Sequence, residues 1–509
     1  MMAAPAQSDG HRLSTLLADL SPVDSAHDVV VSGLTLDSRS AAPGDLFLAC
    51  RGSRQNGWQF IDEAIRSGAV AVVVEAEGIP PLPKKSQPVL PVAGLREKAG
   101  IIADRFFGHP SGDLTVIGVT GTNGKTSVSH FLGEVLGGKY AADRRCGVIG
   151  TLGYGLYGDL HPGINTTPDP VTLHALLAGM VDRDVRYAVL EVSSHGLDQG
   201  RVNGIAFDVA VLTNLSRDHL DYHGDMTRYA KAKSQLFETI SLKHAVCNSD
   251  DEFGRAIADS LPAQVNPVTY GLDGFVSHAK RMRRPRVLGR LRSGNRLGVA
   301  IDVFTPWGDG LLETDLIGQF NAYNLLAALA AVCAIGVPFD VALTRLSAAP
   351  SVPGRMERFG KADGQPLVVV DYAHTPEALH QVLKSVRSHC VGRLWCVFGC
   401  GGDRDPGKRP MMGAAAEAYA DDIVLTSDNP RNEDPDVIIH DILTGVRDKA
   451  RVRIQPDRAR AIGEVLNASK AGDIVVVAGK GHEAYQEIGS ERRPFSDRDL
   501  IQSLLRGTE

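Results

Sequence analysis

Residues 120–127 read Thr120-Gly121-Thr122-Asn123-Gly124-Lys125-Thr126-Ser127, directly after the apolar, strand-like run 114–119 and directly before a helix-like segment. Glycines let the backbone turn tightly, so that successive N–H groups and the start of a helix can face anionic oxygens. Lys125 adds a positive charge, and Thr126 adds a hydroxyl suited to magnesium. The stretch therefore predicts a phosphate-binding loop with ATP as its ligand.

The spacing of this loop departs from the G-x-x-x-x-G-K-[ST] pattern. Val119 stands where the first glycine belongs, and Gly118 comes one residue too early. This difference argues against an ordinary kinase or GTPase. The alternative is a glycine-rich turn that only joins a strand to a helix.

Length and composition limit the classes of protein that fit. A chain of 509 residues exceeds one hydrophobic core and predicts about three domains. A hydrophobic content of 43% and a charged content of 22% are typical of a soluble globular protein. The net charge of −6 argues against a protein that binds duplex nucleic acid, because such proteins normally present a basic face. Small-molecule substrates are expected instead.

The termini and the cysteines indicate a compartment. Residues 1–20 lack the basic and apolar regions of a signal peptide, and no apolar run approaches roughly 18 residues, so we expect no membrane insertion and a cytoplasmic location. The cysteines are odd in number and scattered, which predicts reduced thiols in the core. They are Cys50, Cys146, Cys247, Cys333, Cys390, Cys396 and Cys400.

The alternation of apolar runs and turn residues predicts an α/β fold in three parts. Residues 1–91 form the first part and end in a proline-rich stretch, 79–91, that is typical of a linker. Residues 92–350 hold the phosphate loop and further strand-like runs with helical patterns between them, as in a parallel sheet. Residues 351–509 alternate strands and helices regularly, which predicts a doubly wound domain.

Two residues after predicted strands could serve a metal ion near the loop. Glu191 ends an apolar strand, where open α/β sheets place their ligand crevice, and its carboxylate suits magnesium. His219 follows the next strand-like run, but histidine is a less usual magnesium ligand, and a hydrogen-bonded structural histidine is an equal alternative.

Lys233 lies in a helical pattern on the same side as Leu236 and Phe237. A lysine there commonly extends its ammonium to solvent, and the residues alone favour that reading. A buried lysine would instead have a lowered pKa, and its neutral amine could capture carbon dioxide as a carbamate, an anionic metal ligand.

Seven motifs, in order along nearly the whole chain, resemble the signatures of the Mur ligase family. They are Thr120 to Thr126, Asn165-Thr166-Thr167-Pro168, Glu191 to Gly196, Asp218-His219, Lys233, Gly318-Gln319-Phe320-Asn321 with Asn324, and Pro353-Gly354-Arg355. The resemblance implies three domains: an N-terminal domain for the UDP end of the substrate, a central P-loop ATPase with a parallel sheet, and a C-terminal Rossmann-like domain that brings an amino acid.

The resemblance also implies roles for single residues. Lys125 and Arg355 would act in catalysis, with a magnesium set of Thr126, Glu191, His219 and Lys233, the last as a carbamate. The nucleotide would contact Gly121, Thr122, Asn123, Gly124, Lys125, Thr126, Ser127, Asn321, Asn324 and Asp371. The uridine end would contact Leu36, Ser38, Ser53, Arg54 and Gln55, and the muramoyl dipeptide Asn165, Thr166, Thr167, Ser193, Gln199 and Arg201. On the residues alone, the asparagine pair could be helix caps and Arg355 a surface charge.

The stretch Asp428-Asn429-Pro430-Arg431 resembles the family's diaminopimelate signature, with Arg404, Gly479 and Glu483 as matching partners. A guanidinium can hold the distal carboxylate of meso-diaminopimelate while acidic groups take its ammonium. A β-turn with an exposed arginine is the alternative.

The resemblance implies a monomeric ATP-dependent ligase that joins this amino acid to the D-glutamyl γ-carboxylate of UDP-N-acetylmuramoyl-L-alanyl-D-glutamate through an acyl phosphate, in peptidoglycan precursor synthesis. Alternatives are a lysine-adding ligase, a folylpolyglutamate synthetase, or a nucleotide-binding regulatory protein without catalysis.

Overall fold

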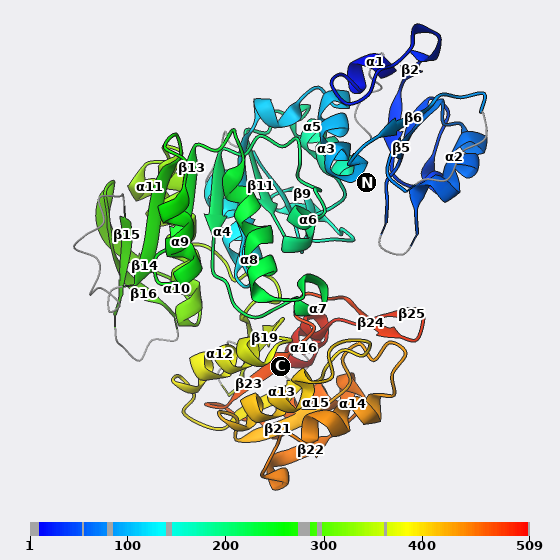
Figure 1. Cartoon of the computed structure of the whole chain (residues 1–509). Coiled ribbons are helices and arrows are strands. Elements are labelled where there is room, and N and C mark those ends of the chain that lie inside the picture. Colours follow the sequence, from blue (N-terminus) through cyan, green and yellow to red (C-terminus); the bar gives the residue numbers. More distant parts are fainter. Residues whose placement is uncertain are drawn as a thin grey trace. The chain divides into compact units, whose positions relative to one another are not determined.

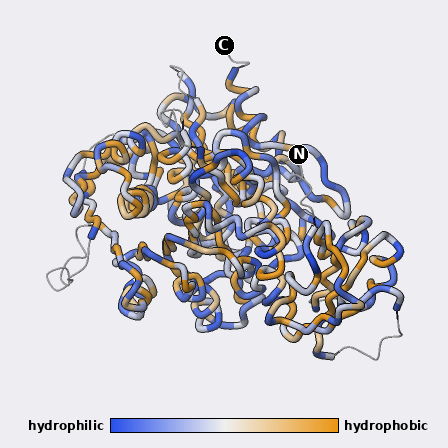
Figure 2. The backbone as a smooth tube through the Cα atoms, turned by 90° about the horizontal axis from the view of Figure 1, so that it is seen from above, coloured by the Kyte–Doolittle hydropathy of each residue, from blue (hydrophilic) through white to orange (hydrophobic). Residues whose placement is uncertain are grey.

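The computed structural model describes residues 10–52, 55–78, 85–138, 145–272, 286–292, 298–360 and 364–506. The chain divides into two compact units (Figure 1). The first contains residues 1–288, 305–308 and 324–345, and the second contains residues 289–304, 309–323 and 346–509. Figure 2 shows hydrophobic stretches alternating with hydrophilic ones along the chain, as expected of elements that bury one face.

The first unit begins with a four-stranded parallel sheet in the order β3-β4-β5-β6. Its strands and the elements beside them are β1 His11–Arg12, α1 Leu13–Leu16, β2 Val30–Val31, β3 Gly33–Thr35, β4 Asp45–Ala49, α2 Ile61–Ser67, β5 Ala71–Glu75, β6 Val89–Val92 and α3 Leu95–Phe106. Apolar side chains of α1, β4, β5 and α3 form one core on this sheet.

The predicted linker over residues 79–91 is wrong in its last part. Residues 79–84 lie outside the described residues, but residues 89–91 belong to β6 and pair with β5. Pro91, opposite Val74, is tolerated because β6 is the edge strand and needs no N–H donor on its outer side. Val92 is buried in the core of this sheet, so the boundary after residue 91 falls inside a strand. The boundaries of three domains remain a prediction.

The phosphate loop follows a strand near the middle of an eleven-stranded sheet, in the order β10-β9-β8-β11-β7-β12-β13-β14-β15-β16-β17. The strands are β7 Thr115–Thr120, β8 Cys146–Gly150, β9 Gly153–Leu156, β10 Asp159–His161, β11 Tyr187–Glu191, β12 Val209–Leu212, β13 His244–Asn248, β14 Asn266–Leu272, β15 Arg286–Leu291, β16 Ala300–Thr305 and β17 Gly308–Glu313. Strands β8, β11, β7, β12, β13 and β14 are parallel, whereas β9 and β10 add antiparallel pairs.

The parallel strands are nearly continuous apolar runs, as strands covered on both faces must be. The helices that accompany this sheet are α4 Lys125–Gly137, α5 Pro170–Val181, α6 Ser194–Asp198, α7 Leu220–His223, α8 Met226–Ser234, α9 Glu252–Ser260, α10 Gln319–Ala334 and α11 Phe339–Ser347. Because β7, β11 and β12 are neighbours and parallel, the residues after them meet at one edge of the sheet.

The second unit holds a six-stranded sheet in the order β18-β19-β23-β20-β21-β22, parallel except for β18. Its elements are β18 Glu357–Phe359, β19 Leu367–Asp371, α12 Pro376–Arg387, β20 Leu394–Phe398, α13 Lys408–Glu417, β21 Asp422–Leu425, α14 Pro435–Leu443, β22 Val452–Ile454, α15 Arg458–Ala468, β23 Ile474–Ala478, β24 Tyr485–Ile488, β25 Glu491–Pro494 and α16 Asp497–Arg506. Apolar clusters cover both faces, which confirms the doubly wound prediction. Among the described helices, none is long and apolar enough to cross a membrane.

Candidate active site

Two glycines give the loop between β7 and α4 its shape. Gly124 caps α4 with φ 88°, and a Cβ there would lie 2.5 Å from Oδ1 of Asn324. Gly121 has φ 144°, and a Cβ there would lie 1.8 Å from Oγ1 of Thr213. Only glycine fits both the conformation and the space. The two glycines lead the chain tightly into the N-terminus of α4, where backbone N–H groups and the positive end of the helix could meet an anion, and binding of phosphate there stays a prediction.

The side chains of the loop brace its backbone. Nζ of Lys125 donates to the carbonyl oxygens of Gly121 and Thr122, at 2.8 and 3.0 Å. The backbone of Asn123 is held by one side chain. Its N–H donates to Oδ1 of Asn214 at 3.0 Å, and its carbonyl oxygen accepts from Nδ2 of the same residue at 3.0 Å. Ser127 is buried in the first turn of α4.

Glu191, the last residue of β11, has a buried carboxylate with three donors. Thr126 Oγ1 donates to Oε2 at 2.9 Å, and Thr151 donates through its N–H to Oε1 at 2.9 Å and through Oγ1 to Oε2 at 3.0 Å. The structure thus brings together the predicted carboxylate and the predicted hydroxyl at the edge of the sheet.

Lys233 lies in the last turn of α8 and is 1% exposed, so the solvent-exposed reading of this lysine is wrong. Its Nζ donates to the carbonyl oxygen of Gly121 at 2.9 Å and lies 4.6 Å from the ring centre of Tyr229. Burial, reinforced by the nearby charge of Lys125, holds the pKa of Lys233 well below its ordinary value. This environment disfavours the charged form of Lys233 beside the phosphate loop.

His219 caps α7 in a left-handed conformation, φ 53°. Its Nε2 lies 3.4 Å from Oδ2 of Asp218, and its ring centre lies 4.9 Å from that of His195 and 6.3 Å from that of Tyr229. Burial lowers its pKa and the charge of Lys125 lowers it further, whereas the charge of Asp218 opposes the shift. The neutral imidazole is therefore favoured.

The predicted magnesium set is brought together only in part. Thr126 and Glu191 touch and offer the oxygen donors that magnesium prefers. Lys233 donates an N–H to the Gly121 carbonyl and would offer magnesium an oxygen ligand only as a carbamate. Within the described residues, no three His, Cys, Asp or Glu side chains gather as a metal site. The hydroxyl and carboxylate fit the ion, and the roles of His219 and Lys233 remain predictions.

Four of the six residues predicted for the muramoyl dipeptide form one chain of contacts. Thr167 Oγ1 lies 3.1 Å from Oγ of Ser193, and Arg201 Nη1 donates to the carbonyl of Thr167 at 2.7 Å. Arg201 Nη2 also donates to Oε1 of Gln199 at 2.7 Å. Thr166 reaches this region through Oγ1 of Thr151, at 3.0 Å.

Asn165 has a different partner, because its backbone N–H donates to the hydroxyl of Tyr154 at 3.1 Å. The described residues among those predicted for the uridine end follow strands of the four-stranded sheet, Leu36 and Ser38 after β3 and Gln55 after β4. Leu36 packs against its core, and Ser38 donates to Glu63 at 2.5 Å. Gln55 is exposed, and Ser53 and Arg54 lie outside the described residues.

The helix-cap alternative for the asparagine pair is wrong, because Asn321 and Asn324 both lie inside α10. Asn321 Nδ2 donates to the carbonyl of Ile317 at 2.8 Å, and Asn324 borders Gly124 as described above.

In the second unit, Asp371 ends β19 and accepts from the N–H groups of Met356 and Ala373, both at 2.8 Å. Burial raises the pKa of Asp371, and the charge of Arg355 opposes that rise. The guanidinium of Arg355 lies 4.5 Å from the ring centre of Tyr372, so it is not a free surface charge.

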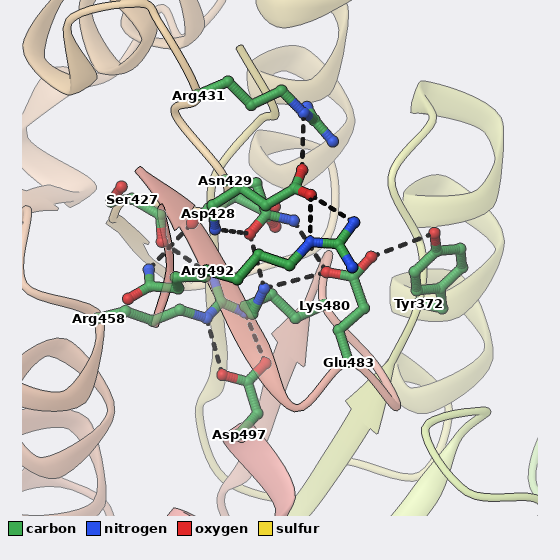
Figure 3. A network of polar contacts seen from close by, with 12 residues as sticks. Tyr372, Ser427, Asp428, Asn429, Arg431, Arg458, Lys480, Glu483, Arg492 and Asp497 are labelled. Atoms are coloured by element: carbon green, nitrogen blue, oxygen red, sulfur yellow. Dashed lines mark hydrogen bonds and ion pairs between the residues drawn. The ribbon is translucent and has the colours of Figure 1, made fainter. Parts of the chain in front are cut away.

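The residues predicted for the amino acid form a polar network at the carboxyl ends of β21 and β23 (Figure 3). Asn429 Nδ2 donates to Oε2 of Glu483 at 2.9 Å. Lys480, which is fully buried, donates to Oδ1 of Asn429 and Oε2 of Glu483, both at 3.0 Å. Oε1 of Glu483 lies 3.5 Å from the hydroxyl of Tyr372. The network fixes the orientation of the Asn429 amide and leaves one glutamate oxygen weakly engaged.

Arg431 has φ 51° and pairs with Glu487, Nε to Oε2, at 2.9 Å. The alternative of an exposed turn arginine is wrong, because its side chain is 23% exposed and Asn429 and Pro430 are buried. Arg404 is exposed, and both it and Arg431 border Gly401. A Cβ on Gly479 would lie 2.4 Å from Oδ2 of Asp428, so that position also requires glycine.

A buried ion pair lies beneath this network. Arg458 Nη2 and Asp497 Oδ2 are 2.7 Å apart, with both side chains fully buried, and Nη2 also donates to the carbonyl of Ala478 at 2.9 Å (Figure 3). The pair connects α15 and α16 to the end of β23.

Sequence reasoning missed Thr151, Tyr229, Lys480 and Glu487. A signal existed for Lys480, which follows directly after the strand 474–478 in the run Gly479-Lys480-Gly481-His482-Glu483. No local pattern marks the other three residues, because tertiary contacts alone bring them to the site.

Three family descriptions match this chain in order. Residues 30–107 match the Mur ligase family, catalytic domain; residues 119–332 match the Mur ligase middle domain; and residues 354–481 match the Mur ligase, glutamate ligase domain. The UDP-N-acetylmuramoyl-L-alanyl-D-glutamate–2,6-diaminopimelate ligase of Chromobacterium violaceum is 50% identical over 92% of this chain and 93% of its own. The ligase of the same name from Pseudomonas aeruginosa is 47% identical over 95% and 96%.

A solved structure of a ligase of that name is 36% identical, covers 98% of this chain and 99% of its own, and superposes with a TM-score of 0.69. The MurF ligase of Thermotoga maritima in complex with ADP is 19% identical, covers 94% of this chain and 98% of its own, and shares the fold with a TM-score of 0.62. The fold, the phosphate loop and these relatives agree, and the chain belongs to the Mur ligase family.

Proposed function

We propose that this protein is an ATP-dependent ligase that adds meso-diaminopimelate to the γ-carboxylate of the D-glutamyl residue of UDP-N-acetylmuramoyl-L-alanyl-D-glutamate. The product is an amide, formed with ADP and phosphate, in peptidoglycan precursor synthesis. The protein is proposed to act as a cytoplasmic monomer, where ATP and the UDP-linked substrate are available and its seven thiols stay unpaired.

One observation carries the choice of amino acid: Asn429, Glu483 and Arg431 lie in one polar network beyond the carboxyl ends of β21 and β23. The guanidinium suits the distal carboxylate of diaminopimelate, and the acidic side of the network suits the distal ammonium. Asp428, Arg404 and Gly479 border the same region. Lysine lacks the second carboxylate and would leave Arg431 without that partner, a loss that can give strong discrimination.

The phosphate loop is proposed to bind ATP. Lys125 and the N-terminus of α4 supply positive charge at the phosphates, and Asn324 beside Gly124 borders the nucleotide. Asn321, Arg355 and Asp371 are proposed to contribute from the rest of the chain. When bound through Thr126 and Glu191, magnesium would neutralise charge on the phosphates.

The γ-carboxylate is proposed to attack the terminal phosphate of ATP, because a free carboxylate is too poor an electrophile for an amine. The P–O bond to ADP breaks as an acyl phosphate forms, and the amine of diaminopimelate then displaces phosphate. Thr167, Ser193, Gln199 and Arg201 orient the dipeptide for this step, together with Asn165 and Thr166. The uridine end is assigned to Leu36, Ser38 and residues 53–55.

Lys233 is proposed to act as a carbamate. Its neutral amine attacks carbon dioxide, forms a C–N bond and releases one proton, which leaves an anionic carboxylate on the helix beside the loop. Burial of Lys233 and its contact with the Gly121 carbonyl support this role, because an uncharged amine is required for the reaction.

Phosphate release and amide product, measured with ATP, magnesium and the UDP-linked dipeptide, test the proposal when meso-diaminopimelate and L-lysine are offered in parallel. Turnover with diaminopimelate and little with lysine is expected. Turnover with lysine would retain the ligase reaction and overturn the assignment of the amino-acid site. No turnover with either would overturn the proposed reaction and direct attention to other amide ligases.

A further inference from the structure

The guanidinium of Arg431 is held on two sides by its own protein. Nε pairs with Oε2 of Glu487 at 2.9 Å, and Nη1 donates to the carbonyl of Gly402 at 2.8 Å. Two backbone hydrogen bonds also join Arg431 to the segment of Glu487. The N–H of Arg431 donates to the carbonyl of Glu487 at 3.0 Å, and the N–H of Gly489 donates to the carbonyl of Arg431 at 2.7 Å. The arginine is therefore ordered without any ligand.

Glu487 is itself fixed by the β24–β25 hairpin. It lies opposite Arg492 in the register of the hairpin, and Arg492 Nη2 lies 2.9 Å from Oε1 of Glu487. Each oxygen of the glutamate thus contacts one arginine. Figure 3 labels both arginines, Arg431 and Arg492. Two cations and one anion leave the trio Arg431, Glu487 and Arg492 with a net charge of about +1, so an incoming carboxylate is attracted despite the glutamate.

The two contacts also decide which edge of the guanidinium remains for a ligand. Of its five N–H groups, Nε–H is used by Glu487 and one Nη1–H by Gly402. Within the described part of the chain, Nη2 donates to no residue. The terminal edge formed by Nη1 and Nη2 can therefore meet a carboxylate through two parallel hydrogen bonds.

We propose that Glu487 is a positioning residue that sets the selectivity of Arg431 for an amino acid with a distal carboxylate. This inference rests on the proposed function. An arginine that samples many rotamers must be ordered when the ligand binds, which weakens binding. Glu487 removes that cost by holding the side chain in advance and directs its terminal edge toward the ligand.

Glu487→Gln tests the proposal, and Glu491→Gln is its matched control. Glu491 is on the same hairpin and pairs with Arg493 at 3.0 Å, but it contacts neither Arg431 nor Gly402 among the described residues. For Glu487→Gln, we expect the KM for diaminopimelate to rise roughly 10-fold to 100-fold, with kcat and the KM for ATP changed less than about 2-fold. The ratio of kcat/KM for diaminopimelate to that for lysine should fall in the same variant and stay constant in Glu491→Gln.

Two further variants keep the test decisive. Glu487→Asp retains the charge and should recover part of the selectivity, and Arg492→Gln, at an exposed side chain, should shift the KM for diaminopimelate in the same direction but less. The inference is overturned if Glu487→Gln matches its control, or if it raises the KM of all three substrates together with a lower thermal midpoint. No turnover of diaminopimelate by the unsubstituted protein would overturn the proposed function and this inference with it, whereas normal turnover with unchanged variants would overturn the inference alone.

Discussion

The side-chain nitrogen Nζ of Lys233 lies 2.9 Å from the carbonyl oxygen of Gly121, although 112 positions separate the two residues. The end of α8 is therefore joined to the phosphate loop through a side chain that is almost completely buried. This contact places a side chain with a lowered pKa against the backbone of the phosphate loop, where we propose that it acts in phosphoryl transfer.

Replacement of Lys233 by alanine should lower the rate of phosphate release by at least about 100-fold, because the group that becomes anionic beside the loop is lost. Lys231→Ala, at an exposed lysine of the same helix, is the control and should keep the normal rate. Carbon-13 NMR with labelled bicarbonate should show a carbamate signal in the unsubstituted protein and none in Lys233→Ala. A normal rate in Lys233→Ala would contradict the assigned role.

Gly124→Ala should weaken ATP binding about 10-fold, because a left-handed backbone costs a non-glycine residue about 1–2 kcal/mol and the new Cβ would meet Asn324. Gly158→Ala separates the two effects, since its φ of 91° is similar but no atom lies within 4 Å of the added Cβ. The measurement is the KM for ATP in both variants. Equal values in the two variants would show that the contact with Asn324 is unimportant.

Acid should destabilise the first unit through His195. Burial, with smaller contributions from His219, His223 and Arg201, lowers the pKa of His195 from 6.5 to about 4, while Asp221 opposes the shift. As the pH falls, His195 binds its proton in the unfolded chain before it does so in the folded protein. The contribution of neutral His195 to the free energy of unfolding is therefore complete above pH 6.5 and is lost as the pH falls toward 4. The urea midpoint between these pH values should fall less in His195→Gln than in the unsubstituted protein. His161→Gln, at an exposed histidine, should leave the slope intact.

Asp497→Asn should destabilise the second unit by about 3–5 kcal/mol, because it leaves the buried charge of Arg458 without its partner. Asp499→Asn, at an exposed position of the same helix, should change stability by less than about 0.5 kcal/mol. Amide hydrogen exchange of β21 and β23 in urea measures the stability of the second unit in both variants. Replacing Arg458 by methionine together with Asp497 by leucine should restore much of the loss, and a double variant as weak as Asp497→Asn would contradict this explanation.

Local patterns predicted the strands well where they are apolar on both faces. In the part predicted to alternate strands and helices, the apolar runs 367–371 and 474–478 coincide with β19 and β23, and the run 114–119 before the phosphate loop is shifted by one residue from β7. The end of β6 was misread because proline and small polar residues also mark linkers, and only pairing with β5 distinguishes an edge strand. Helical periodicity placed Lys233 on the side of Leu236 and Phe237, but it could not show that the amine is covered, because the loop that contacts it is far away in sequence.

The candidate site was predictable where a side chain belongs to a motif and unpredictable where it supports one. Glu191 and Thr126 were identified from their positions after a strand and in a loop. Thr151, which donates twice to Glu191, and Glu487, which holds Arg431, carry no local signature, because their partners are 40 and 56 positions away. Such supporting contacts depend on how strands are ordered in the sheet and not on spacing along the chain.

The left-handed backbone of Arg431 records a compromise between folding and recognition. A glycine would adopt φ 51° without penalty, and an asparagine would adopt it more easily than arginine does. The chain nevertheless keeps the longest cationic side chain at this turn, where it opposes Glu487. Glycine here would relieve the backbone conformation but remove the contacts with Glu487 and Gly402, so the backbone cost of Arg431 and its proposed role in recognising the amino acid fall on a single residue.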